Sequence, residues 1–192
     1  MDNLLKNQSV LQEQANEVVL HLDLKNLLSK FGEFKLVGSI IYGLMTWRDI
    51  DIDLVLLSDP SDEMYWEIVK TLFEKAGVKN LNLADNRKQD ETDRPRSMYI
   101  GVKYEDYLKN IWKIDIRLLG KEFVTTDAVE ELIKTATEEH RKTILTIKSK
   151  VHDNPKYHKT FSSLDIYEAV IKQNISDLNE FHSYLDKNNK EH

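Results

Sequence analysis

Between residues 49 and 57 the chain alternates acidic and apolar side chains and then continues as an apolar run, Leu54–Leu57. Because successive side chains of a β-strand point to opposite faces, Asp51 and Asp53 would lie on one face of a strand over 51–57. Two carboxylates on one face of an apolar strand repel each other unless a cation lies between them. Carboxylate oxygens suit Mg²⁺ or Mn²⁺, so the pattern indicates a metal site. The other interpretation is an edge strand with a solvated acidic face.

A short apolar strand predicted over 34–37 ends in Gly38 and Ser39, just before a predicted helix. Glycine lets another group approach the backbone closely, and Ser39 could cap the helix and offer its hydroxyl to a phosphate. An ordinary turn is the plainer interpretation of this pair. The apolar residues 40–45 are interpreted as packed helix, and Arg48 supplies one cation nearby.

A third pattern places one acid among apolar residues in a predicted strand over 111–118. Lys113, Asp115 and Arg117 would share one face of this strand. Taken by itself, this face could be a surface whose charges neutralise one another.

Elsewhere the periodicity predicts helices over 10–31, 61–76, 127–150, 162–173 and 176–187, and strands over 78–83 and 98–104. Ser9 is expected to cap the first of these helices, and Gly77 to end the second. The change from mixed strands to helices near residue 121 predicts two parts, 1–120 and 121–192.

The combination of these motifs resembles the DNA polymerase β-like nucleotidyltransferase superfamily. The shared pattern is Gly38-Ser39, a spacer of eleven residues, the apolar-flanked pair Asp51 and Asp53, and Asp115 on a later strand. The resemblance covers about 38–118. It implies an α/β (α+β) fold in which a mixed sheet is flanked by helices, with a C-terminal helical extension.

The resemblance also implies roles for single residues. Asp51 and Asp53 would hold two Mg²⁺ (or Mn²⁺) ions, and Asp115 would complete one metal site and could receive the proton of an acceptor hydroxyl. Gly38 and Ser39 would bind the phosphates of the nucleotide.

One ambiguity concerns Asp49, which shares its face with Asp51 and Asp53. Asp49 with Asp51 is therefore an alternative metal pair. Asp51 with Asp53 is preferred because the apolar run Leu54–Leu57 then follows the acids, as it does in relatives.

The resemblance implies transfer of a nucleoside monophosphate from an NTP, with ATP expected, to a hydroxyl group. The small chain, which lacks an evident RNA-binding module, favours a small-molecule acceptor. AMPylation of a protein hydroxyl is one alternative, and an inactive nucleotide-binding or scaffold protein is another. The complete set of acids argues for an active enzyme.

Composition excludes several other classes. The chain has 27 basic and 33 acidic residues, a net charge of −6, which disfavours a general nucleic-acid binder. It has no cysteine, which excludes disulfides and thiol catalysis. Its longest uncharged stretch, Leu36–Trp47, has twelve residues, whereas a membrane span needs roughly 20. A soluble, cytoplasmic protein is expected.

Residues 141–159 carry six basic residues and one acid. This segment could bind a triphosphate or an anionic acceptor such as RNA, with Lys142 and Lys148 as the first candidates. A solvated helix face is the plainer interpretation, since no aromatic recognition motif accompanies the charges. The apolar stripes over 164–185 would pack on the catalytic domain or on a partner in a homodimer.

Overall fold

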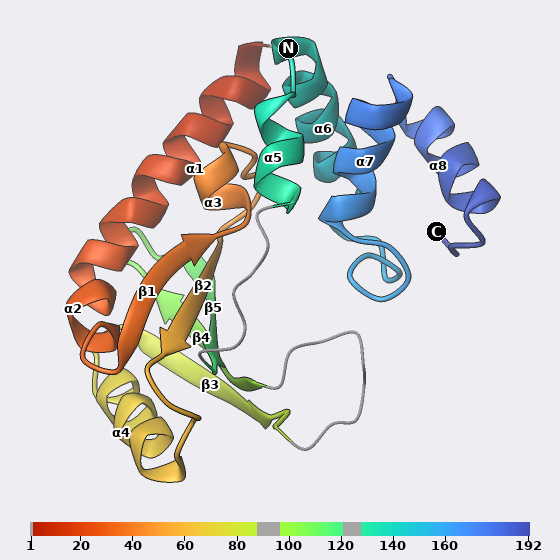
Figure 1. The fold of residues 1–192 in the computed structure, drawn as a ribbon. Coiled ribbons are helices and arrows are strands. Elements are labelled where there is room, and N and C mark those ends of the chain that lie inside the picture. The colour runs from red at the N-terminus through yellow and green to blue at the C-terminus, as the bar shows by residue number, and fades with distance from the viewer. Residues whose placement is uncertain (1, 88–96, 121–127) are drawn as a thin grey trace. The chain divides into compact units, whose positions relative to one another are not determined.

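The structure is a computed structural model that describes residues 2–87, 97–120 and 128–192 (Figure 1). Its helices are α1 (Asp2–His21), α2 (Leu24–Leu28), α3 (Ser39–Tyr42), α4 (Asp62–Phe73), α5 (Ala128–Lys134), α6 (Glu138–Val151), α7 (Ser163–Gln173) and α8 (Leu178–Lys187). Its strands are β1 (Gly32–Val37), β2 (Asp49–Leu56), β3 (Val78–Asp85), β4 (Ser97–Glu105) and β5 (Ile111–Leu119). The expected α/β class, with a mixed sheet and helices at the C-terminal end, is confirmed.

Within the described residues, the five strands form one sheet in the order β1-β2-β5-β4-β3. The pairing of β2 with β5 is parallel, and the other pairings are antiparallel. Strand β2 therefore lies inside the sheet, between β1 and β5. The alternative prediction, that the acidic strand is an edge strand, is wrong, because β2 is hydrogen-bonded to β1 on one side and to β5 on the other.

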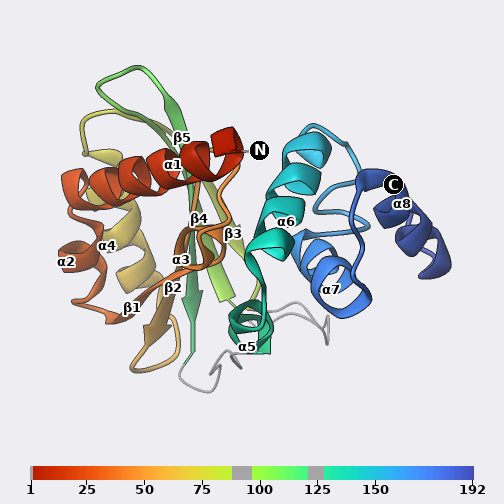
Figure 2. The same ribbon diagram turned by 90° about the horizontal axis from the view of Figure 1, so that it is seen from above.

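The apolar residues of the central strands occupy one face of the sheet. Ile50, Ile52 and Leu54 of β2 are fully buried, as are Ile114 and Ile116 of β5. Figure 2 shows α2 and α4 on one side of this sheet. Because side chains alternate along a strand, the residues between these apolar positions project from the opposite face. That opposite face carries the acidic residues of β2.

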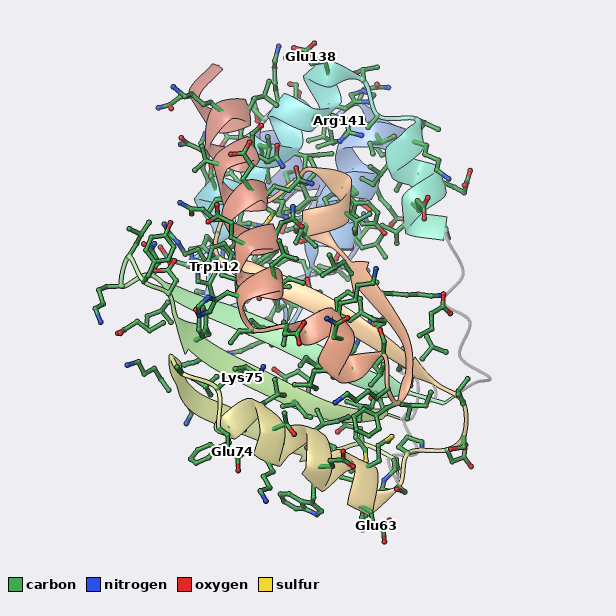
Figure 3. All side chains as sticks on the ribbon, turned by 90° about the vertical axis from the view of Figure 1, so that its left-hand side faces the viewer. Glu63, Glu74, Lys75, Trp112, Glu138 and Arg141 are labelled. Carbon is green, nitrogen blue, oxygen red and sulfur yellow. The ribbon has the colours of Figure 1, made fainter. Side chains whose placement is uncertain are left out.

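Helix α4 shows how local signals set the helix bounds. Ser61 caps its N-terminus by accepting a hydrogen bond from the backbone N–H of Met64. Gly77 has a φ of +89°, which suits glycine and allows the chain to turn into β3. Glu63 and Glu74 are exposed and point away from the sheet (Figure 3).

Three predictions about the helices are wrong: where the first helix begins, where it ends, and that a single helix covers 127–150. The first helix begins at Asp2, and the Ser9 hydroxyl lies within it, where it donates to the carbonyl of Leu5. The same helix ends at His21, and Asp23 adopts a left-handed conformation before α2. The helix predicted over 127–150 is two helices in the described chain, because Thr137 caps the second by accepting from the N–H of His140.

The described chain divides into two compact units. The sheet unit comprises residues 11–43 and 47–120, and the helical unit comprises 128–192 with 2–10 and 44–46. The predicted boundary near residue 121 lies outside the described residues, so the division into 1–120 and 121–192 stays a prediction. No helix in the described part of the chain is long and apolar enough to cross a membrane.

The helical unit has a core of its own. Its fully buried apolar residues include Ile144, Leu145 and Ile147 of α6, Ile166 and Val170 of α7, and Phe181 and Leu185 of α8. Lys148 of α6 is also fully buried, and its ammonium donates to the carbonyl of Leu44 at 2.8 Å. Lys148 is therefore a core residue of this unit, not part of a solvated basic face.

Candidate metal centre

The parallel pairing of β2 with β5 sets the order of charges on the open face of the sheet. Three pairs of charged residues stand side by side across it: Asp49 with Lys113, Asp51 with Asp115, and Asp53 with Arg117. The outer two pairs each join an acid to a base. The middle pair joins two acids, and it is there that a cation would be most stabilised.

Asp49, Asp51 and Asp115 form the acidic group of the site. One carboxylate oxygen from each lies within 4.8 Å of the other two, among the residues that the structure describes. The side chains of Asp49 and Asp115 are 16% and 19% exposed, so a cation from solvent can reach them. The structure thus brings together the alternative pair, Asp49 and Asp51, with Asp115.

Asp53 does not belong to this group, although it lies on the same face of β2. Its side chain is buried, and both of its oxygens accept hydrogen bonds from Arg117, from Nε at 2.7 Å and from Nη2 at 2.8 Å. A bidentate pair of this kind satisfies a buried carboxylate and leaves it little capacity to bind a metal. In this structure Asp53 is paired with Arg117, and the assignment of Asp51 with Asp53 as the metal pair stays a prediction.

Gly38 gives Asp51 the space it occupies. The backbone of Gly38 has a φ of +71°, and a Cβ at this position would lie 2.7 Å from Oδ2 of Asp51. Both the conformation and the close approach require glycine. The predicted turn therefore adjoins the acidic group directly, with Ser39 as the first residue of the one-turn helix α3.

Tyr99 of β4 reaches the same group from the other side of β5. Its hydroxyl donates to Oδ1 of Asp115 at 2.7 Å. The ring has room because a Cβ on Gly101 would lie 2.4 Å from that hydroxyl. Burial raises the pKa of the Tyr99 phenol well above its usual range, and the hydrogen bond to Asp115 adds to the rise. The phenol therefore stays protonated and donates.

Lys113 supplies the positive charge nearest to the acids. Its ammonium lies 2.5 Å from Oδ2 of Asp115 and 3.4 Å from Oδ1 of Asp49. Burial works to lower the pKa of Lys113, but the charges of Asp49 and Asp115 outweigh it and raise that pKa above its usual range. Lys113 is therefore a cation throughout the physiological pH range.

Burial and the two neighbouring acids together perturb the carboxyl group of Asp51. Burial raises the pKa of Asp51 to about 7, and the charges of Asp49 and Asp115 add to the rise, while Lys113 and Arg117 oppose it. A divalent cation would relieve this repulsion. The donor set, three carboxylates that each place one oxygen within 4.8 Å of the other two, fits a hard cation such as Mg²⁺ or Mn²⁺.

Two other predicted residues have partners within their own units. The guanidinium of Arg48 lies over the ring of Trp112, whose side chain is buried among the apolar positions of β5. Lys142 belongs to the helical unit, where its ammonium pairs with Glu138 at 2.7 Å.

Sequence reasoning missed Tyr99 and Gly101. A tyrosine and a glycine two residues apart in an apolar strand place both on one face. That spacing could have indicated a ring lying over a glycine. Only the pairing of β4 with β5, which sets Gly101 opposite Asp115, brings the ring to the acidic group.

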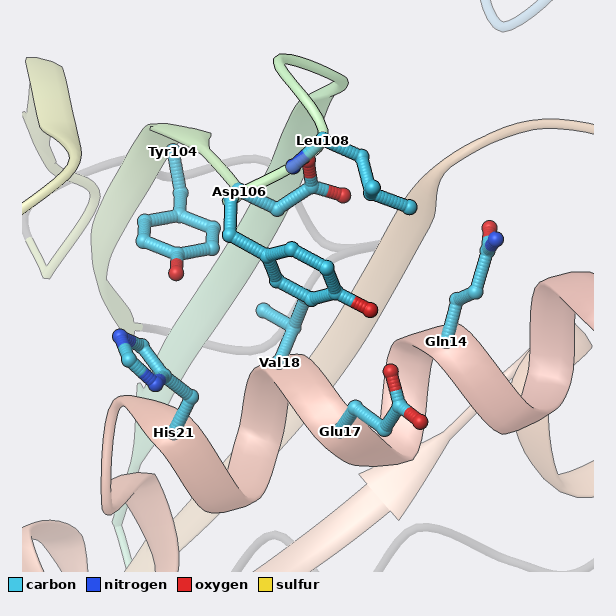
Figure 4. A pocket seen from close by; sticks show the side chains of 8 residues that line it. Gln14, Glu17, Val18, His21, Tyr104, Asp106 and Leu108 are labelled. Carbon is cyan, nitrogen blue, oxygen red and sulfur yellow. The ribbon is translucent and has the colours of Figure 1, made fainter.

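A pocket of about 260 Å³ lies apart from the three carboxylates, between α1 and the turn that joins β4 to β5 (Figure 4). Its lining residues are Gln14, Glu17, Val18, His21, Tyr104, Asp106, Tyr107 and Leu108. The acid at its floor, Asp106, accepts hydrogen bonds from Leu108 N–H, Asn110 N–H and Trp112 Nε1. Asp106 is therefore committed to holding the turn.

Comparison with known proteins gives similarity at the level of the fold. A scan against protein-family models finds no match, and neither does a search of curated proteins. Among solved structures, the Cid1 poly(U) polymerase with Mg and 3′-dATP bound aligns with a TM-score of 0.59 and 18% identity, covering 82% of this chain and 48% of that one.

A cytoplasmic RNA terminal U-transferase aligns with a TM-score of 0.57 and 17% identity, covering 91% of this chain and 55% of that one. A further Cid1 structure, described as an RNA terminal uridylyl transferase, aligns with a TM-score of 0.60 and 16% identity, over 91% of this chain and 53% of that one. The chain spans about half the length of these structures. It shares their fold over the aligned part, a mixed sheet flanked by helices, as the sequence predicted.

We expect Gly38→Ala to destabilise the protein by about 1–3 kcal/mol, because a Cβ there is strained and displaces the Asp51 carboxylate. Chemical denaturation measures the loss. Ile41→Ala, in the same helical turn and 51% exposed, is the control and should change stability by less than about 0.5 kcal/mol. Equal stability of Gly38→Ala and the natural protein would contradict this geometry.

We expect the contribution of Asp51 to stability, in buffer with a chelator, to fall as pH rises. Its pKa is about 7 in the folded protein against an ordinary 3.8, so the folded state binds more protons than the unfolded state between these values. The free energy of unfolding, relative to that of Asp51→Asn, should decrease from about pH 4 to about pH 7 and level off above. Asp59→Asn, at an exposed position, is the control. If the difference in the free energy of unfolding between the natural protein and Asp51→Asn did not depend on pH, the pKa of Asp51 would not be raised by folding.

Proposed function

We propose that this chain catalyses the metal-dependent transfer of a nucleoside monophosphate from an NTP to a hydroxyl group. The observation that carries the proposal is the group formed by Asp49, Asp51 and Asp115 on the charged face of a nucleotidyltransferase fold. We assign these three carboxylates as the metal ligands. Asp53 takes a structural role, because it is buried against Arg117.

The chemistry follows from the donor set. A divalent cation bound by these acids would lower the pKa of the acceptor hydroxyl and stabilise the charge that develops on the leaving pyrophosphate. Asp115, oriented by the Tyr99 hydroxyl, is the residue that we assign to accept the proton of the hydroxyl. Gly38 and Ser39, at the turn beside Asp51, are the proposed binding site for the phosphates.

For the acceptor we propose a small hydroxylated molecule, and for the donor ATP with Mg²⁺. The net charge of −6 supports this choice, since a polyanionic acceptor would be repelled by the acidic chain. The 3′ hydroxyl of an RNA is the second candidate. It is favoured by the names of the aligned structures, which describe poly(U) polymerase and RNA terminal U-transferase.

The test is release of pyrophosphate from each NTP with Mg²⁺, and transfer of label from the α-phosphate to an acceptor. We expect Asp49→Asn and Asp51→Asn to lower the rate by at least about 100-fold, because each removes a ligand of the cation that stabilises the transition state. Pools of small alcohols, an RNA with a free 3′ hydroxyl and the same RNA with a blocked 3′ end identify the acceptor class.

Asp53→Asn is the matched variant, since it removes the same charge from the same face of β2. We expect it to bind Mn²⁺ within a few-fold of the natural protein and to lose stability, because Arg117 loses its bidentate partner. Loss of Mn²⁺ binding in Asp53→Asn with retention in Asp49→Asn would overturn the assignment of ligands. Absence of turnover with every NTP and acceptor would reject the enzyme and favour a nucleotide-binding protein.

A further inference from the structure

The two oxygens of Asp115 are both engaged by protein donors. Oδ1 accepts from the Tyr99 hydroxyl at 2.7 Å, and Oδ2 accepts from the Lys113 ammonium at 2.5 Å. Lys113 also reaches Oδ1 of Asp49 at 3.4 Å. The lysine thus bridges two of the three carboxylates that the proposed function assigns to the metal.

A divalent cation bound to Oδ2 of Asp115 would lie close to the Lys113 ammonium that contacts the same oxygen. A bound Mg²⁺ lies about 2.0–2.1 Å from each carboxylate oxygen, and a second cation at hydrogen-bond distance from the same oxygen would be repelled. Metal binding at Oδ2 would therefore weaken the contact with the charged Lys113, whereas the neutral Tyr99 hydroxyl on Oδ1 does not repel the ion.

The two donors differ in their freedom to move. The ring of Tyr99 lies over Gly101, and the carbonyl of Tyr99 accepts a hydrogen bond from Tyr65 at 2.8 Å, so both its side chain and its backbone are held. The side chain of Lys113 is 56% exposed and carries its ammonium on four flexible methylenes. Lys113 is the donor that can leave without disturbing the sheet.

We propose that Lys113 competes with the divalent cation for Oδ2 of Asp115, and so sets the metal concentration at which the site fills. This inference rests on the proposed function, because it takes Asp49, Asp51 and Asp115 as the metal ligands. Lys113 is on this account a positioning residue that holds two of the acids together.

The competition links metal binding to nucleotide binding. An ammonium displaced from a carboxylate gains most from another anion nearby, and a triphosphate is such a partner. A nucleotide would therefore lower the cost of moving Lys113, and metal and nucleotide would each strengthen binding of the other.

The experiment measures binding of Mn²⁺ alone, by calorimetry or by the paramagnetic signal of the free ion, in the absence of nucleotide. We expect Lys113→Met to bind Mn²⁺ about tenfold more tightly than the natural protein, because a charge-assisted hydrogen bond no longer opposes the metal. Lys113→Arg, which keeps the charge, should stay near the natural affinity.

Lys103→Met is the matched control. Lys103 lies on β4 directly opposite Lys113, and its side chain is exposed. The Lys103→Met variant removes one positive charge from the face of the sheet that also carries Lys113. Because solvent screens an exposed charge, we expect this variant to tighten Mn²⁺ binding by no more than about twofold. Equal tightening in both methionine variants would overturn the inference, since the effect would then come from net charge.

A second arm tests the link to the nucleotide. With a non-hydrolysable NTP analogue present, we expect the gain in Mn²⁺ affinity to be larger in the natural protein than in Lys113→Met. Mn²⁺ binding that is unchanged or weaker in Lys113→Met, while the natural protein binds Mn²⁺ and releases pyrophosphate, would overturn this inference alone. If the natural protein neither binds Mn²⁺ nor releases pyrophosphate, the proposed function fails as well.

Discussion

The register between β2 and β5 is the constraint on which the site depends. In this register Asp51 stands beside Asp115, and each neighbouring acid of β2 stands beside a base. A slip of one residue would turn every charge into the apolar core. A slip of two would keep the faces but pair Asp115 with another acid of β2. The contacts of Lys113 and Arg117 with their acids favour the observed register over that one.

The apolar face of the same two strands holds this register in place. Ile50 stands beside Ile114, Ile52 beside Ile116, and all four side chains are fully buried. Burying such side chains contributes roughly 1.5–3 kcal/mol each relative to exposing them. Together, the four buried isoleucines contribute more free energy than the repulsion between a pair of close carboxylates costs in a partly solvated site. The apolar core therefore stabilises a pairing that places Asp51 beside Asp115.

Parts of this site could be predicted from the sequence, because they depend on local pattern. The alternation from Asp49 to Leu56 shows a strand with acids on one face, and Gly38 shows a turn that admits close approach. Asp115 stands out as an acid within an apolar strand. None of these patterns contains the register between strands that are distant in the chain, and the register sets Arg117 beside Asp53. The apolar run after Asp53 favoured Asp51 with Asp53, because it gives no information on the residue that stands beside Asp53 in the sheet.

The central claim is that Asp49, Asp51 and Asp115 hold a divalent cation beside the turn at Gly38. A crystal of the protein with Mn²⁺ and a non-hydrolysable NTP analogue, measured by anomalous scattering, tests it most directly. We expect an anomalous peak within coordination distance of these three carboxylates, with Asp53 still paired to Arg117. A peak bound by Asp53, or no peak at the acidic face, would contradict the claim.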